Sequence, residues 1–308
     1  RGDLNLRLLE RAGGHERVEL HFEAPIVEVD FSTGEVVVEE IRDGTRRTVA
    51  GDLIVGADGA YSAIRAAMQR SGDRGGFGFS QAFISHGYKE LEIPPTPEGE
   101  FAMDPNALHI WPRGASMMIA LPNPDRSFTC TLFWPREGAG TTFAALEASD
   151  DPRTFIRGVY PDAVDLMPAL EDDVRDNPVG NLVTISCTNW CCGDRAVLLG
   201  DAAHAIVPFY GQGMNAAFQD CLVLQKHLRA GRGDLKAVVE GFSAEQKPNG
   251  DAIARLSMEN FLVMRDRVNS RWFHLVQRLG RLLHRLVPSR VQPVYNMVSF
   301  STTPYHEI

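Results

Sequence analysis

Apolar and polar residues alternate along the first part of the chain in patterns that predict one helix, a set of strands and a second helix. Residues 1–12 place Leu4, Leu8 and Leu9 on one face, which predicts a short helix. Three segments with alternating polarity follow, separated by Ser-Thr-Gly and Asp-Gly turn signals. They predict a β-meander that leads into a buried strand at 53–55, and the sequence SAIRAAMQR then predicts a helix.

The middle of the chain, residues 77–135, is rich in strand patterns whose turns contain Pro and Asn, which predicts a mostly antiparallel sheet. Helical patterns follow at 141–166, and residues 178–190 predict a strand. After residue 231 apolar side chains recur at steps of about three and four residues and predict a buried helical stripe. Its members are Leu256, Phe261, Val268, Trp272, Leu275, Leu279, Leu282 and Leu286.

The segment 193–224 joins three features that suit a flat heterocyclic ligand. A short apolar run at 196–199 predicts a buried strand, which breaks at Gly200-Asp201. An Asp at the carboxyl end of a strand can accept hydrogen bonds from a polyol, and Gly211 and Gly213 in the next loop let backbone approach a ring. A helix predicted from Met214 offers unpaired N–H groups to an anionic ring.

Composition limits the classes of function. The chain has 308 residues, is 44% hydrophobic and carries a net charge of −9, which disfavours nucleic acid as the main partner. The five cysteines are dispersed without paired spacing, which indicates reduced thiols and argues against a zinc site. No apolar run is long enough to span a membrane and no signal peptide opens the chain, so a cytoplasmic location is expected. Attachment through a segment beyond residue 308 stays an open alternative.

Two motifs resemble those of the FAD-dependent aromatic hydroxylases. GDAAHAIVPFYGQGMNAAFQDCLV resembles the second flavin motif of that family, and DLIVGADGAYSAIR resembles its DG motif. Arg1, Leu4 and Asn5 match the family's R-x-x-L-N pattern, whose Arg contacts the flavin. The resemblance implies a mixed α/β fold, with an incomplete Rossmann-like FAD domain, an inserted antiparallel β-sheet substrate domain and C-terminal helices. The domains expected are a partial FAD-binding domain at 1–70, the substrate domain at 71–178, more of the FAD domain at 179–230 and a helical region at 231–308.

Within that family, the stretches HGYKELEIPP and HIWPRGASMMIALPNPDRSFTCTLF are most similar to the enzymes that act on kynurenine. This implies FAD as cofactor, NADPH and O₂ as co-substrates, and hydroxylation of L-kynurenine to 3-hydroxykynurenine, with no catalytic protein nucleophile and no metal. The implied cofactor-binding residues are Arg1, Ile26, Asp58, Ala63, Asp201, Pro208, Gly211, Gln212, Gly213, Met214 and Asn215. The implied substrate-binding residues are Phe209, Tyr210, Asn269 in its VNS segment and Tyr305 in its YHE segment.

Other interpretations stay open at this stage. Asp58 alone could simply cap the next helix, and His86, His109 and Trp111 are expected to pack in strands rather than to act in catalysis. The family's GxGxxG unit, which binds the ADP half of FAD, has no counterpart in these 308 residues. We therefore expect weak FAD affinity if the polypeptide is whole. The alternatives are a hydroxylase of another aromatic acid and a truncated, non-catalytic remnant.

Overall fold

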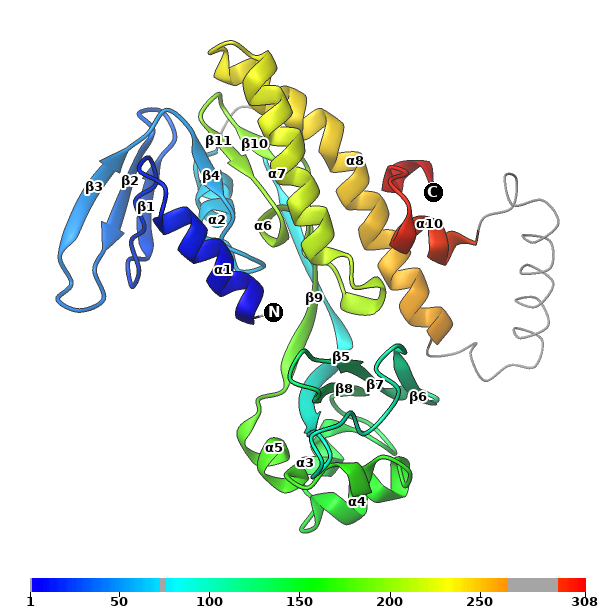
Figure 1. Cartoon of the computed structure of the whole chain (residues 1–308). Helices are drawn as coiled ribbons and strands as arrows, with labels where there is room; N and C mark the ends of the chain where they lie inside the picture. Colours follow the sequence, from blue (N-terminus) through cyan, green and yellow to red (C-terminus); the bar gives the residue numbers. More distant parts are fainter. Residues whose placement is uncertain (1, 73–75, 265–292) are drawn as a thin grey trace.

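A computed structural model describes residues 2–72, 76–264 and 293–308. Figure 1 shows a small sheet near the N-terminus, a central layer with two long helices beside it, and a second, larger sheet that carries several short helices. Two long strands, β5 and β9, run from the larger sheet into the central layer (Figure 1). The fold is mixed α/β, as the sequence predicted.

The N-terminal part contains the predicted helix and meander. Helix α1 (Gly2–Gly13) is followed by strands β1 (Ile26–Asp30), β2 (Glu35–Glu39) and β3 (Arg46–Ala50). The three strands form an antiparallel sheet in the order β1-β2-β3, which confirms the meander. Helix α1 has no buried residue: Leu4 and Leu8 are exposed and Leu9 is only half-buried.

The central sheet brings together segments that are far apart in the sequence. Strand β4 (Ile54–Gly56) pairs in parallel with β11 (Ala196–Leu198), which pairs antiparallel with β10 (Cys191–Cys192). All of β11 is buried, as predicted, but Val55 in β4 is 41% exposed because β4 is the edge strand of this sheet. Helix α2 (Ala63–Arg70) packs Ile64 and Met68 against the same core.

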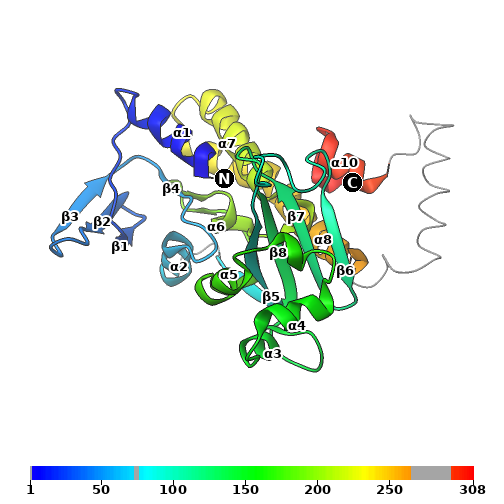
Figure 2. The ribbon, with the colours of Figure 1, turned by 60° about the horizontal axis from the view of Figure 1, so that its bottom comes forward.

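The second sheet is antiparallel and has five strands in the order β6-β7-β8-β5-β9. The strands are β5 (Phe79–Ile93), β6 (His109–Arg113), β7 (Ser116–Pro122), β8 (Phe128–Pro135) and β9 (Gly180–Cys187). A separate core, with Trp134 and Tyr160 fully buried, lies between this sheet and the short helices that Figure 2 shows on it. They are α3 (Phe143–Glu147), α4 (Pro152–Val159), the 3₁₀ turn η1 (Val164–Leu166) and α5 (Leu170–Asp176).

The later part of the chain is mostly helical. It comprises α6 (Asp201–His204), the 3₁₀ turn η2 (Pro208–Tyr210), α7 (Gly213–Ala230), α8 (Leu235–Leu262), α10 (Val294–Phe300) and the 3₁₀ turn η4 (Tyr305–Glu307). Of the predicted helical stripe, Leu256 and Phe261 are buried in α8, and the members from 268 onward lie outside the described residues. In the part that the structure describes, no helix is both long and apolar enough to cross a bilayer.

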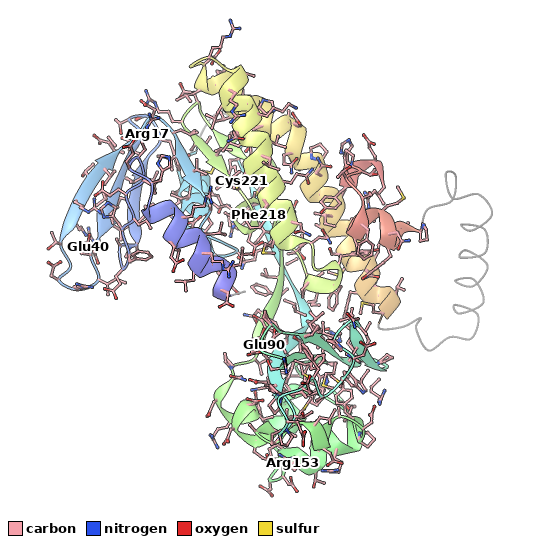
Figure 3. All side chains as sticks on the ribbon, in the orientation of Figure 1. Arg17, Glu40, Glu90, Arg153, Phe218 and Cys221 are labelled. Atoms are coloured by element: carbon pink, nitrogen blue, oxygen red, sulfur yellow. The ribbon has the colours of Figure 1, made fainter. Side chains whose placement is uncertain are left out.

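The buried face of α7 carries few of the large apolar residues of this helix. Leu222 is 68% and Leu228 43% exposed, and Phe218 and Cys221, both labelled in Figure 3, are exposed as well. The face that packs against the protein carries Ala216, Asp220 and Leu224. The sequence pattern predicted this helix, and the structure shows that its inward face includes a charged residue.

Candidate functional site

The turn at Asp58-Gly59 (the DG turn) and the turn at Gly200-Asp201 (the Gly200 turn) lie side by side at one edge of the central sheet. Strands β4 and β11 are parallel and Leu198 is in register with Gly56, so both chains leave the sheet at the same end. The backbone N–H of Leu199 donates to the carbonyl of Gly56 at 2.9 Å. The DG turn and the Gly200-Asp201 turn, 142 residues apart from Asp58 to Gly200, are therefore neighbours.

The turn at Gly200 requires glycine. Its φ of 55° and ψ of −139° are accessible essentially to glycine alone, and an added Cβ would lie 3.1 Å from the Cβ of Ala217 in α7. Asp201 follows as the first residue of α6 and its side chain is exposed. Its carboxylate accepts no hydrogen bond from any residue that the structure describes, so it is available to a ligand.

Asp58 caps α2. Its carboxylate accepts hydrogen bonds from Ser62 Oγ at 2.5 Å and from the backbone N–H groups of Ala63 and Ile64 at 2.7 and 3.1 Å. The structural role proposed for Asp58 from the sequence is therefore present. Ala63, the first residue of α2, has an exposed side chain beside this cap.

Arg65 joins the two turns, a role that the sequence analysis did not assign to it. The side chain is 2% exposed, and its guanidinium donates to the carbonyl of Ala202 at 2.8 Å and to that of Ala60 at 2.6 Å. The guanidinium also lies 4.6 Å from the ring centre of Phe79. Desolvation by burial lowers the pKa of Arg65. An Arg in the first turn of a predicted helix, among the small and apolar residues of SAIRAAM, was the available sequence signal.

The loop before α7 leaves space at the backbone where a flat ring could lie. Gly211 adopts a left-handed conformation with φ of 67°, and an added Cβ there would meet no other atom within 4 Å. Helix α7 begins at Gly213, no side chain caps its first turn, and the side chains of Met214 and Asn215 are exposed. This end of α7 faces the five-stranded sheet (Figure 1).

Phe209 and Tyr210 point into two different clusters. Phe209, 8% exposed, stacks on Phe261 of α8 with ring centres 4.6 Å apart and lies 5.1 Å from the ring centre of Phe133 in β8. Its carbonyl accepts from Asn260 Nδ2 at 2.9 Å. The ring of Tyr210 instead lies 5.8 Å from that of Tyr295, and burial raises the pKa of its hydroxyl. Pro208 begins the turn that holds both residues.

Tyr305, near the C-terminal end of the described chain, contacts the loop before α7, residues 208–212, which we call the cofactor loop. Its Oη donates to Gln212 Oε1 at 3.1 Å, and Asn215 Nδ2 donates to the same oxygen at 3.0 Å. Tyr305 and Gln212 are 8% and 7% exposed, and burial raises the pKa of Tyr305. A residue expected at the substrate and two expected at the cofactor thus share one hydrogen-bonded cluster.

The remaining expected residues stand apart or cannot be placed. Ile26 lies in β1 and packs against the core that includes Ile64, away from these hydrogen bonds. Arg1 and Asn269 lie outside the described residues. The three residues expected to pack do make packing or structural contacts: His86 is buried and bonded through both ring nitrogens, His109 stacks with Trp111, and the Trp111 indole N–H donates to Asp162.

The donors and acceptors present fit a flavin. The exposed Asp201 carboxylate suits a polyol hydroxyl, the open backbone at Gly211 suits the approach of a flat ring, and the uncapped start of α7 suits a ring that becomes anionic when reduced. In the described ranges no three His, Cys, Asp or Glu side chains gather as metal ligands would. The arrangement is one that binds and orients an organic cofactor.

Comparison with known proteins shows the family to which this chain belongs. Residues 4–233 match the family described as "FAD binding domain". The kynurenine 3-monooxygenase of Flavobacterium psychrophilum is 42% identical over 307 residues, which cover 100% of this chain and 68% of that protein. The enzyme of the same name from Salinispora tropica is 46% identical over 94% of this chain and 62% of its own length, and the Sus scrofa enzyme is 42% identical over 100% and 64%. The chain thus spans about two thirds of the length of these relatives.

Solved structures agree on the fold. A tetrameric form of 2-methyl-3-hydroxypyridine-5-carboxylic acid oxygenase matches with a TM-score of 0.67 at 21% identity, covering 86% of this chain and 67% of that one. Klebsiella pneumoniae HpxO complexed with FAD and uric acid matches with a TM-score of 0.64 at 19% identity, covering 93% and 70%. At these identities the likeness concerns the fold alone.

Proposed function

Because this chain belongs to the FAD-binding domain family, and to the kynurenine 3-monooxygenases within it, we propose that the protein hydroxylates L-kynurenine to 3-hydroxykynurenine, using FAD, NADPH and O₂. The substrate in this proposal is taken from the names of the similar proteins. The observation in this chain that carries the proposal is the hydrogen bond from Tyr305 to Gln212, because it places the C-terminal segment on the loop that suits a flavin.

Each part of the site has a task that its chemistry can perform. FAD, when bound and reduced by NADPH, supplies the activation of O₂ for insertion of one oxygen atom into an electron-rich aromatic ring. Asp201 would bind a polyol hydroxyl of the cofactor, and the first N–H groups of α7 would stabilise negative charge on its ring. The packed rings of Phe209, Phe133 and Phe261 exclude water from the side of the loop that faces the five-stranded sheet.

Tyr305 is suited to hold a polar group of the substrate. Because burial raises the pKa of its hydroxyl above the ordinary value of 10.0, the group stays protonated and keeps its bond to Gln212 through neutral and mildly alkaline pH, and its oxygen can accept a hydrogen bond from the substrate. In the proposal, Tyr305 and Asn269 contact kynurenine, and Phe209 and Tyr210 shape the site around its ring. The cofactor contacts proposed are those expected from the sequence: Arg1, Ile26, Asp58, Ala63, Asp201, Pro208, Gly211, Gln212, Gly213, Met214 and Asn215.

The proposal is tested by flavin content and by coupled turnover. The protein is purified in its full natural length, its absorbance is scanned for bound flavin, and NADPH oxidation is followed with L-kynurenine, with 4-hydroxybenzoate and with neither. The expected result is bound FAD, oxidation stimulated by L-kynurenine alone, and 3-hydroxykynurenine identified by mass spectrometry. Asp201→Ala is expected to lose flavin, whereas Asp194→Ala, at an exposed acidic residue of the same segment, retains it.

Two other results would point to the alternatives. Stimulation by 4-hydroxybenzoate without effect of L-kynurenine would make the protein a hydroxylase of another aromatic acid. Binding of L-kynurenine with no flavin and no turnover would make it a non-catalytic binding protein. Either outcome would refute the proposed reaction.

A further inference from the structure

A line of buried polar side chains crosses the protein from the Gly200 turn to the C-terminal segment. Its three inner members are Asp220 in α7 and Gln246 and Asn249 in α8, and their exposed fractions are 0%, 2% and 5%. Gln246 Nε2 donates to Asp220 Oδ1 at 2.9 Å, and Asn249 Nδ2 donates to Gln246 Oε1 at 3.2 Å. Interior polar groups joined in this way form one unit rather than separate contacts.

The line ends at a residue next to Tyr305. Asn249 Oδ1 accepts from the backbone N–H of His306 at 3.3 Å and faces His306 Nδ1 at 2.8 Å. At the other end, Asp220 Oδ2 accepts from the backbone N–H of Gly200 at 2.8 Å and faces His204 Nε2 at 2.6 Å. The turn that carries Asp201 and the turn that carries Tyr305 are thus connected through the interior.

The carboxylate of Asp220 sets the direction of every bond in the line. Asp220 Oδ1 accepts from Gln246, so Gln246 turns its NH₂ group toward Asp220 and its oxygen toward Asn249. Asn249 must then turn its NH₂ group toward Gln246 and its oxygen toward His306. Reversing any one amide would set two donors or two acceptors against each other in a buried position, which is costly.

The turn η4 is therefore held from two sides. Tyr305 Oη bonds to Gln212 in the cofactor loop, and His306, one residue later, bonds to Asn249 in α8. Figure 1 shows η4 and α10 against the flank of α8. The turn has only three residues and no side-chain cap of its own, so it depends on these contacts and on the apolar cluster around Tyr305.

We propose that Asp220, Gln246 and Asn249 are positioning residues that fix Tyr305 at the cofactor loop, so that occupancy of the Gly200 turn and the placement of the substrate-binding tyrosine depend on one another. This inference rests on the proposed function, because it assigns these residues to the same site. None of the three contacts substrate: they act through His306 and through the Gly200 turn. Their loss weakens kynurenine binding more than it slows turnover.

Two substitutions at Asn249 separate positioning from a merely structural role. Asn249→Leu removes both the bond to Gln246 and the bond to His306. Asn249→Asp also removes the donor to Gln246 but keeps an oxygen for His306. Both variants lose the bond inside the core, Asn249→Asp also sets an acceptor against Gln246 Oε1, and only Asn249→Leu loses the bond at η4. A structural role alone would therefore make Asn249→Asp at least as damaging as Asn249→Leu.

The measurements are the Kd of L-kynurenine by quenching of flavin fluorescence, kcat and KM, and hydrogen exchange of the peptide 303–308 in the substrate-free protein. For Asn249→Leu we expect Kd and KM to rise about tenfold with a smaller change in kcat, and exchange of the His306 amide to quicken about tenfold, as loss of one buried hydrogen bond gives. For Asn249→Asp we expect Kd within about threefold of the unmodified protein and near-normal exchange. Gln225→Leu, at an exposed residue of α7, serves as the control.

Equal Kd values for the two Asn249 variants, or unchanged Kd and exchange in Asn249→Leu, would overturn the inference. If Asn249→Leu does not fold, His306→Ala provides the same test at an exposed side chain, where Kd should rise about threefold or more and an unchanged Kd would count against the proposal. If the unmodified protein fails to turn over kynurenine, the proposed function falls, and the exchange of the His306 amide still decides whether Asn249 holds the turn.

Discussion

Replacing Arg65 by methionine tests whether one buried guanidinium ties the two motif turns together. Methionine keeps a long apolar stem inside the core but removes the donors to the carbonyls of Ala202 and Ala60. Those two carbonyls would then lie in a region that water reaches poorly, since Arg65 is only 2% exposed. The change therefore acts at the junction between the DG turn and the Gly200 turn.

The magnitude follows from the contacts that are lost. Each hydrogen bond from a charged donor contributes about 1.5–3 kcal/mol, and the guanidinium over Phe79 adds about 0.5–2 kcal/mol. Against this, burial of the charge is unfavourable, as the lowered pKa of Arg65 indicates, and its Nε has no hydrogen-bond partner within the described residues. Removing this unpaired buried Nε stabilises the Arg65→Met variant by about 1–3 kcal/mol. We expect a net loss of about 2–4 kcal/mol.

The assay is urea unfolding followed by circular dichroism, with Arg70→Met as the control. Arg70 lies in the last turn of the same helix and is exposed, so its replacement should change the free energy of unfolding by less than about 0.5 kcal/mol. Because Ala202 follows Asp201, the Arg65 variant should also retain less flavin. Equal stability of the two variants, or a loss below about 0.5 kcal/mol for Arg65→Met, would refute the reasoning.

Three further predictions concern other parts of the described chain. Asp58→Ala removes the acceptor for three hydrogen bonds at the start of α2 and should lower the free energy of unfolding by about 1–2 kcal/mol in urea unfolding, while an unchanged value would show that the cap is dispensable. Gly250→Ala gains up to about 1 kcal/mol of helix propensity, but the added Cβ would lie 2.6 Å from Cζ2 of the buried Trp190. Overpacking costs about 1–3 kcal/mol, so the variant should be less stable, and a rise in its melting temperature would contradict this. Burial raises the pKa of Cys130 to about 12 and of Cys187 to about 11 from an ordinary 9.0, so the thiols of the unfolded chain ionise first. Their contribution to stability is complete below pH 9 and is lost as pH rises to about 11 for Cys187 and to about 12 for Cys130. Unfolding free energies at pH 8 and pH 10 measure it, and equal values would exclude it.

Local patterns in the sequence were sufficient to predict most of the elements around the site. The apolar run at 196–199 forms β11, the alternation at 77–135 forms antiparallel strands, and Gly211 forms the turn before α7. These signals succeed because strand alternation, helical periodicity and glycine geometry act between near neighbours. The motifs at 200–223 and at 52–65 also led to the family, since each joins several such signals in a fixed order.

Burial was harder to predict than the elements themselves. In α7 the leucines at 222 and 228 are exposed and Asp220 is fully buried, and in β4 Val55 is exposed at the sheet edge. Hydropathy assigns an Asp to the surface because an isolated buried charge is unfavourable. Asp220 is tolerated inside because its partners come from α6 and α8, at Gly200, His204 and Gln246.

The sequence by itself therefore determined the strands, the helices, the glycine turns and the family to which the chain belongs. Only the tertiary structure decided that Arg65 bonds to Ala202 across 137 residues and that Tyr305 bonds to Gln212 across 93. A hydrogen bond between side chains so far apart leaves no periodic signal in the chain. It depends on how α2, α7, α8 and η4 pack, and that packing is fixed by the whole core rather than by any one segment.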